Sequence, residues 1–158
     1  MSEPLPLHEL IDDPSISGDV ALLRQINPKP QSNNIDWATI DADGKPKVRS
    51  AAFQRASRQF AEREGYPQQT LSLYLESVVV QQHGSVQGWL EAVGRQDYGV
   101  VRITAQLVRH EGVMAIQRDD HRGYLGHCAA WAIESGSKAR ADEPVLAARS
   151  EWVVVPER

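Results

Sequence analysis

Hydrophobic residues occur along the chain in short runs, and glycine or proline bounds most of them. Such runs, when β-branched or alternating with polar residues, are typical of β-strands. The clearest is 71–75 (LSLYL), where Ser72 and Tyr74 alternate with leucines, so the leucines are expected to face the core. The other predicted strands are 20–26, 35–40, 78–80, 98–104, 113–117, 127–133 and 152–155, the last ending in the sheet interior.

Four further segments carry helix signals. In 50–65, Ser50 is a candidate N-cap and Gly65 is placed to end the helix. The remaining predicted helices are 86–93 with Ser85 as N-cap, 105–112, and 143–150 with Pro144 in its first turn.

The order of these elements predicts one α+β domain over residues 19–158, with a mixed, mostly antiparallel sheet and three to four helices. Only 98–117 alternates strand and helix as a parallel fold would. Residues 1–18 contain three prolines among acidic residues and are expected to form an irregular N-terminal arm. No repeat or linker divides the chain.

The composition of the 158 residues excludes several classes of protein. A single cysteine can form neither an internal disulfide nor a cysteine-based zinc finger. No apolar run approaches the ~18 residues of a membrane span, so we expect a soluble cytoplasmic protein with no membrane partner.

The charge balance, 17 Lys and Arg against 21 Asp and Glu, argues against nucleic acid as the main partner. Three arginines on the predicted helix 50–65 nevertheless offer a local basic face: Arg55, Arg58 and Arg63. Binding of nucleic acid phosphates through this face is one alternative, and a solvated helix surface is the simpler interpretation.

The polar segment 118–126 and the start of the next strand concentrate residue types that bind divalent metals. They are Asp119, Asp120, His121, His127 and Cys128. Their spacing matches no helical or paired-cysteine pattern whose geometry would explain it, so we predict no metal site and no other cofactor. The alternative role of the two aspartates is to stabilise a turn.

His127 stands where this polar segment meets an apolar strand, so its side chain can face a cleft and exchange protons near neutral pH. It is the candidate catalytic residue; the alternative is that it bonds a loop carbonyl and pins the turn. Cys128 is a poor partner for it, because adjacent strand residues point to opposite faces.

Arg24 lies inside the apolar run 20–26, where a guanidinium must find an anion or a cluster of carbonyls. Either it is an internal strut, or it binds a phosphate or carboxylate together with Arg49, Ser50 and Asp119. An Arg on a first strand, a Ser near a second and a later Glu also form the loose outline of an ADP-ribosyltransferase site. No Walker-type or GxGxxG phosphate loop is present.

Several short motifs follow one another over most of residues 20–155: Arg24–Pro28 (RQINP), Ser50–Phe53 (SAAF), 71–75 (LSLYL), Asp119 and Gly126–His127. Their order resembles a family of small uncharacterised bacterial proteins. In that family an Arg-x-Ile-His/Asn-Pro strand end precedes a Ser-Ser-x-Ala-Phe segment, and an Asp-Pro turn precedes Pro-Ala-His-Ala.

The chain departs from this family pattern at Ala51 in place of the second serine, Asp120 in place of a proline, and Leu125–Gly126 in place of Pro-Ala. Arg24, Phe53 and His127 match it. The resemblance therefore implies a fold and a site around these residues, and it implies no particular reaction.

The leading hypothesis is a small cytoplasmic bacterial binding or regulatory module that is not an enzyme. It would engage a partner protein or a small anionic ligand through a cleft near Arg24, Ser50 and His127. The alternative is an enzyme that acts on a nucleotide-like substrate with His127 as acid or base. Nucleic-acid binding through the arginine-bearing helix is the third possibility.

Overall fold

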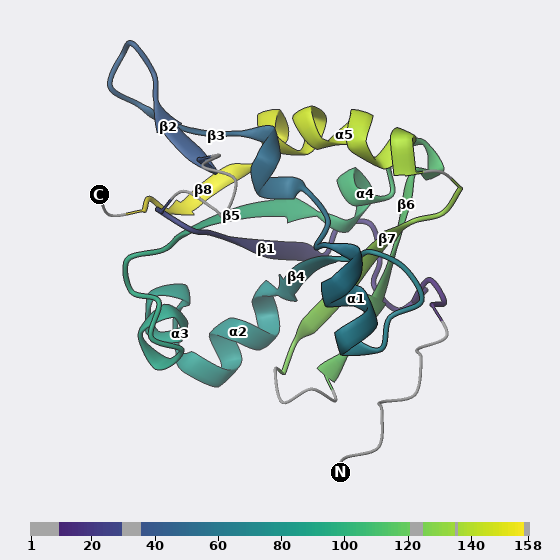
Figure 1. Ribbon diagram of the computed structural model, residues 1–158. Coiled ribbons are helices and arrows are strands. Elements are labelled where there is room, and N and C mark those ends of the chain that lie inside the picture. Colours follow the sequence, from purple (N-terminus) through teal and green to yellow (C-terminus); the bar gives the residue numbers. More distant parts are fainter. Residues whose placement is uncertain (1–9, 30–35, 121–124, 135, 157–158) are drawn as a thin grey trace.

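A computed structural model describes residues 10–29, 36–120, 125–134 and 136–156 (Figure 1). The strands are β1 (Ala21–Ile26), β2 (Ala38–Ile40), β3 (Pro46–Val48), β4 (Leu71–Leu75), β5 (Gly99–Thr104), β6 (Met114–Arg118), β7 (His127–Ala132) and β8 (Glu151–Val154). The helices are η1 (Ser50–Phe53), α1 (Arg58–Glu64), α2 (Glu76–His83), α3 (Val86–Ala92), α4 (Ala105–Val108), η2 (His110–Gly112) and α5 (Gly136–Arg149), where η marks a 3₁₀-helix.

Six strands form one sheet in the order β6-β7-β4-β1-β5-β8, and every neighbouring pair is antiparallel. β2 and β3 form a separate hairpin. The predicted single α+β domain is confirmed. The described residues hold five α-helices rather than three to four, and each is too short or too polar to be a transmembrane segment.

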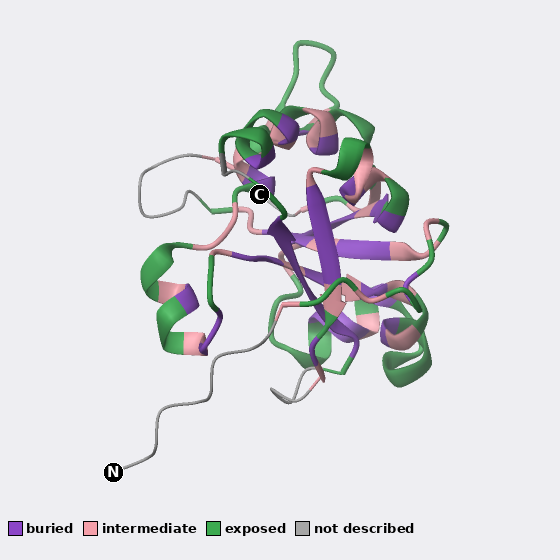
Figure 2. Cartoon of the chain, turned by 90° about the vertical axis from the view of Figure 1, so that its right-hand side faces the viewer, coloured by how far each residue is buried: buried purple, intermediate pink, exposed green. Residues whose placement is uncertain are grey.

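One face of the large sheet carries the main core. Leu71, Leu73 and Leu75 are buried on this face, as their alternation with polar residues predicted. η1, α4 and α5 cover it, and the strands are buried between these helices and the opposite layer (Figure 2). The leucine side of β4 is therefore closed to ligands.

The opposite face of the sheet is covered at its two ends. α2 and α3 pack there over Leu23 and Val100 through residues that include Trp89. At the other end, Ala61 of α1 and Tyr66 pack against Ala129 of β7. The stretch of sheet between these two covers is where β4 presents its polar side chains.

Two predicted elements are wrong. Residues 78–80 lie in α2 rather than in a strand. Of the three valines only Val79 is buried, and Val80 is 41% exposed, so the segment packs against the core on one side only. The predicted helix 50–65 is split into η1 and α1. Ser57, not Ser50, caps α1, its hydroxyl accepting from Phe60 N at 3.1 Å.

The C-terminal predictions also need correction. α5 begins at Gly136, well before Pro144, which lies exposed inside the helix rather than in its first turn. Proline has no N–H, so one carbonyl of the helix lacks its usual intrahelical partner. At an exposed position water can bond that carbonyl instead. β8 pairs only with β5 among the described strands, so it is an edge strand and not an interior one.

The described residues of the N-terminal arm, 10–18, contain no helix or strand but are docked on the domain. The Asp12 carboxylate accepts from Ile116 N at 2.9 Å, and Asp13 N donates to Ile116 O at 2.8 Å. Ile16 is buried in the main core.

Substitution of Ser50 and of Ser57 distinguishes the predicted single helix 50–65 from the observed division into η1 and α1. We expect Ser57→Ala to lower the free energy of unfolding by about 1 kcal/mol, because it leaves a helix N–H without its cap. Ser50→Ala should change it by less than about 0.5 kcal/mol, because Ser50 makes no capping bond. Urea unfolding of both variants measures this, and equal losses would contradict the assignment.

Candidate functional site

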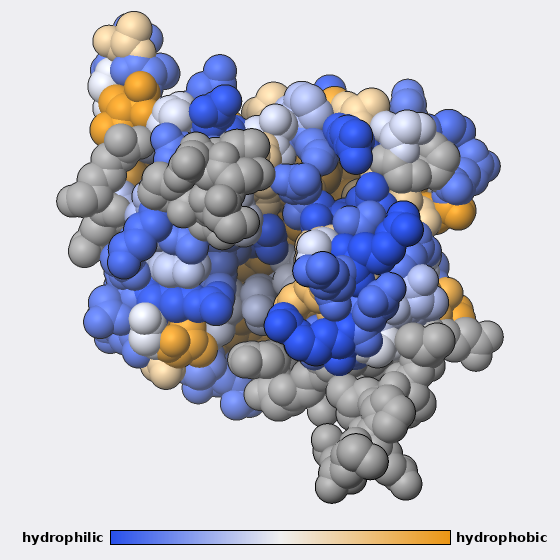
Figure 3. Space-filling model, in the orientation of Figure 1, coloured by the Kyte–Doolittle hydropathy of each residue, from blue (hydrophilic) through white to orange (hydrophobic). Residues whose placement is uncertain are grey.

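A cavity of about 520 Å³ opens on the sheet face between α1 and α3. Seen as in Figure 1, the surface is hollowed there between hydrophilic rims (Figure 3). Its lining residues are Arg24, Gln25, Asn27, Trp37, Phe60, Glu64, Tyr66, Ser72, Tyr74, Trp89, Val93, Arg95, Tyr98 and His127. Two residues predicted from the sequence, Arg24 and His127, thus share one cavity.

Arg24 occupies the place where β1 and β4 separate. The two strands are in register only at Leu22↔Leu75 and Leu23↔Tyr74. Beyond these pairs the guanidinium replaces the backbone ladder: Nη1 donates to Ser72 O at 3.1 Å, and Nε donates to Ala52 O at 2.8 Å. Arg24 is therefore a strut, one of the two roles predicted for it.

No carboxylate among the described residues balances the charge of Arg24. Its partners within the described part of the chain are two carbonyls and the ring of Trp37, whose centroid lies 4.8 Å from Cζ. Desolvation lowers the pKa of Arg24 to about 10, and Arg95 adds to the lowering. The group still carries its charge at neutral pH, so the strut is also a cation at the cavity wall.

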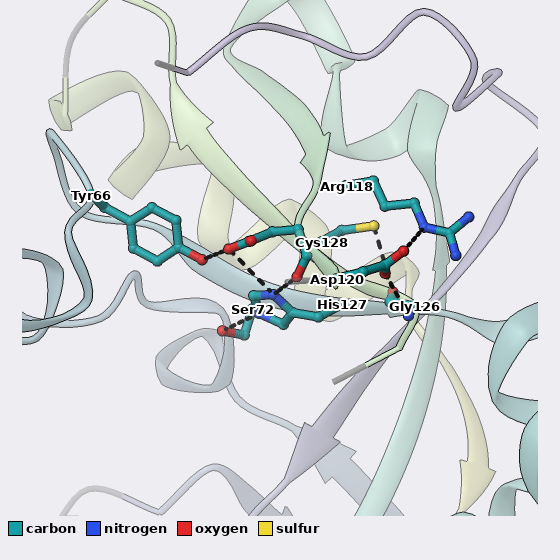
Figure 4. Close-up of polar contacts among 8 residues, drawn as sticks. Tyr66, Ser72, Arg118, Asp120, Gly126, His127 and Cys128 are labelled. Atoms are coloured by element: carbon teal, nitrogen blue, oxygen red, sulfur yellow. Dashed lines mark hydrogen bonds and ion pairs between the residues drawn. The ribbon is translucent and has the colours of Figure 1, made fainter. Parts of the chain in front are cut away.

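His127 and Ser72 lie on neighbouring strands of the cavity floor. The register places His127 opposite Tyr74 and Ser72 opposite Ala129, so the pair is a diagonal one on the same face. His127 Nε2 lies 3.1 Å from Ser72 Oγ, and Nδ1 lies 3.3 Å from the carbonyl oxygen of Asp119. Figure 4 shows His127 and Ser72 pointing toward one another.

These two contacts assign the tautomer of His127. A carbonyl only accepts, so Nδ1 carries the proton and donates to Asp119 O. Nε2 of the neutral ring then accepts the hydroxyl proton of Ser72. The predicted bond from His127 to a loop carbonyl is present, and so is the orientation that a proton acceptor needs.

Asp119 stands behind His127 rather than on the cavity wall. It is buried, and its Oδ2 accepts a hydrogen bond from Tyr66 OH and lies 3.9 Å from His127 Nδ1. Asp119 N also donates to His127 O at 2.8 Å. The carboxylate therefore places negative charge near the imidazole and ties β7 to the residues that follow α1.

The turn before His127 is held by Asp120. Its Oδ1 accepts from Gly126 N at 2.8 Å and its Oδ2 accepts from Arg118 Nε at 2.7 Å (Figure 4). Gly126 has a positive φ of 88° and its O accepts from Leu75 N at 2.8 Å. Asp120 thus stabilises the turn, the alternative role that the sequence suggested for it.

Cys128 and metal binding find no support at this site. Cys128 lies in the main core on the far side of β7, and desolvation raises the pKa of its thiol to about 12. Among the residues that the structure describes, no group of three His, Cys, Asp or Glu side chains is placed to hold a metal. His121, another of the candidates, lies outside the described residues.

Arg49 and Ser50 line a different cavity, together with Trp152 of β8 and the start of β3. η1 reaches Arg24 instead through the carbonyl of Ala52. The Arg, Ser and Glu outline of an ADP-ribosyltransferase site is thus not assembled with Ser50.

The predicted basic face is divided. Arg55 and Arg58 line one hollow with Arg140, whereas Arg63 is 72% exposed next to Glu64. The three arginines therefore do not form one continuous surface on a single helix, since Arg55 precedes α1.

Sequence reasoning missed Ser72 and Tyr66 as site residues. Ser72 was assigned to the polar side of its strand, and that is the signal that places it on the cavity floor. Tyr66 and Asp119 are 53 residues apart in the sequence, and no local sequence pattern predicts their contact.

The three residues on which the expected resemblance to a bacterial family rests lie in different places. Arg24 and His127 face the cavity, whereas Phe53 is fully buried in the main core. Comparison of the chain with models of known protein families, with curated proteins and with solved structures finds no match.

Gly126 tests how strictly the turn positions His127. A Cβ there would lie 3.0 Å from Cβ and Cγ1 of Val78, and φ is in the left-handed region. Gly44→Ala is the matched control, because Gly44 has a φ of 77° and nothing within 4 Å.

We expect Gly44→Ala to cost about 1 kcal/mol of unfolding free energy from backbone strain alone. Gly126→Ala should cost roughly 1–3 kcal/mol more because of the clash, and it should shift the imidazole resonances of His127. Denaturant unfolding and proton–nitrogen NMR measure the two effects. Equal costs, with unchanged His127 resonances, would show that the turn does not constrain the histidine.

Proposed function

We propose that this protein binds a small nucleotide-like molecule, with a planar ring and a phosphate, in the cavity between α1 and α3. The observation that carries the proposal is the cation of Arg24, held at the cavity wall by carbonyls and balanced by no carboxylate among the described residues. A cytoplasmic location, consistent with a single cysteine, is part of the proposal.

Charge favours an anion in this cavity. Arg95 is a second cation of its lining, hydrogen-bonded to Gln25 and lying over the ring of Tyr98 at 5.1 Å. Glu64 is the one carboxylate among the described lining residues. An anion that enters receives charge-assisted hydrogen bonds, and it relieves the cost of desolvating the Arg24 guanidinium.

The walls favour a planar ring. Tyr74 packs edge-on against Trp89 at 4.9 Å and against His127 at 5.4 Å. The other aromatic residues of the lining are Trp37, Phe60, Tyr66 and Tyr98. Bases stack on such rings with about 1–3 kcal/mol each. The volume of about 520 Å³ lies in the usual range of small-molecule sites, roughly 300–1,000 Å³.

The proposal is tested by titrating the protein with AMP, GMP, CMP and UMP and following its tryptophan fluorescence, because Trp37 and Trp89 line the cavity. We expect at least one nucleotide to bind. The matched nucleoside, which lacks the phosphate, should bind about tenfold or more weakly, because a charge-assisted bond contributes about 1.5–3 kcal/mol.

Arg24→Lys keeps the charge but loses the planar fork, so it should weaken nucleotide binding about tenfold. Arg149→Gln, at an exposed position away from the cavity, is the matched control and should bind as the unmodified protein does. Absence of binding, or equal affinities for nucleotide and nucleoside, would contradict the proposal. In that case a partner protein becomes the better candidate for this surface.

A further inference from the structure

The floor of the cavity holds a serine whose hydroxyl faces a proton acceptor. Ser72 Oγ lies 3.1 Å from His127 Nε2, the nitrogen that is unprotonated in the neutral ring. Both side chains line the cavity. This is the geometry in which a histidine activates a hydroxyl for attack.

The histidine is itself oriented. Nδ1 donates to Asp119 O, and the Asp119 carboxylate, held by Tyr66, lies 3.9 Å from the same nitrogen. When Nε2 takes a proton, the ring becomes a cation, and the nearby buried carboxylate stabilises it. Asp119 and Tyr66 are thus positioning residues, and His127 is equipped both to accept a proton and to return it.

The anion site adjoins the same serine. Arg24 donates from Nη1 to the carbonyl of Ser72, so its guanidinium lies beside the nucleophile's own backbone. Nη2 makes no hydrogen bond within the described part of the chain and is left for a ligand. A phosphate bound there lies next to Ser72, and the cation offsets the negative charge that otherwise repels an attacking oxygen.

We propose that Ser72 is the nucleophile of a phosphodiester hydrolase and that His127 is its general base and acid. The inference rests on the proposed function for the nucleotide-like character of its substrate. The cavity would then hydrolyse the molecule that it binds.

The reaction proceeds in two displacements. Ser72 Oγ attacks phosphorus and its proton passes to His127 Nε2; the Oγ–P bond forms, the bond from phosphorus to the leaving oxygen breaks, and that oxygen takes the proton as an alcohol. Water then attacks phosphorus while His127 takes its proton. The Oγ–P bond breaks, Ser72 recovers the proton, and a phosphate monoester leaves, with no oxidant or reductant required.

Thymidine 5′-(p-nitrophenyl phosphate) is the probe, because it joins a planar base, a phosphodiester and a coloured leaving group. We expect release of p-nitrophenolate by the unmodified protein. Ser72→Ala and His127→Asn should lower the rate by about a hundredfold or more. Ser50→Ala, a serine of another cavity, is the matched control and should retain the rate.

Two readouts separate catalysis from a structural role. Ser72→Ala should still bind thymidine 5′-monophosphate with unchanged affinity, which an unfolded variant would not. Acid quenching of the unmodified protein during turnover should trap a nucleotidyl group on the peptide that contains Ser72, detected by mass spectrometry.

Release of p-nitrophenolate that persists in Ser72→Ala, or no release by a protein that binds nucleotides, would overturn the inference and leave the proposed function intact. Failure of both binding and cleavage would overturn both. A trapped adduct on another residue would also overturn the assignment of Ser72.

Discussion

The separation of β1 from β4 after Leu23 is the constraint on which the site depends. If the two strands stayed paired, the carbonyl of Ser72 would accept from the backbone of β1, and no guanidinium could reach it. Arg24 instead closes this gap and satisfies carbonyls of both β4 and η1. Completing the backbone hydrogen bonds thus brings a cation to the cavity, because the residue that repairs the ladder is charged.

The antiparallel register then determines which side chains meet that cation. Ser72, Tyr74 and His127 fall on one face, and the leucines of β4 fall on the other. A slip of one residue would exchange the two sets and bury the polar groups in the main core. The same alternation that builds the core therefore also builds the cavity floor, so the site and the stability of the sheet are not independent.

Local patterns were sufficient for much of this fold and for part of the site. Alternation identified the strand 71–75, and the junction of loop and strand identified His127. Residues 78–80 were predicted as a strand because their β-branched composition favours one. In the structure they form part of α2, in which Val79 is buried. The pair of Tyr66 and Asp119 depends on chain segments far apart in sequence, and no periodicity carries that information.

Cys128 follows His127 directly but points into the main core from the opposite side of β7. Its thiol has no route to reagents while the sheet is intact, because the core helices and the neighbouring strands enclose it. Alkylation of this single thiol therefore requires the domain itself to open. The rate of Cys128 alkylation therefore reports on global opening, and a ligand that binds only the folded cavity slows it without touching the thiol.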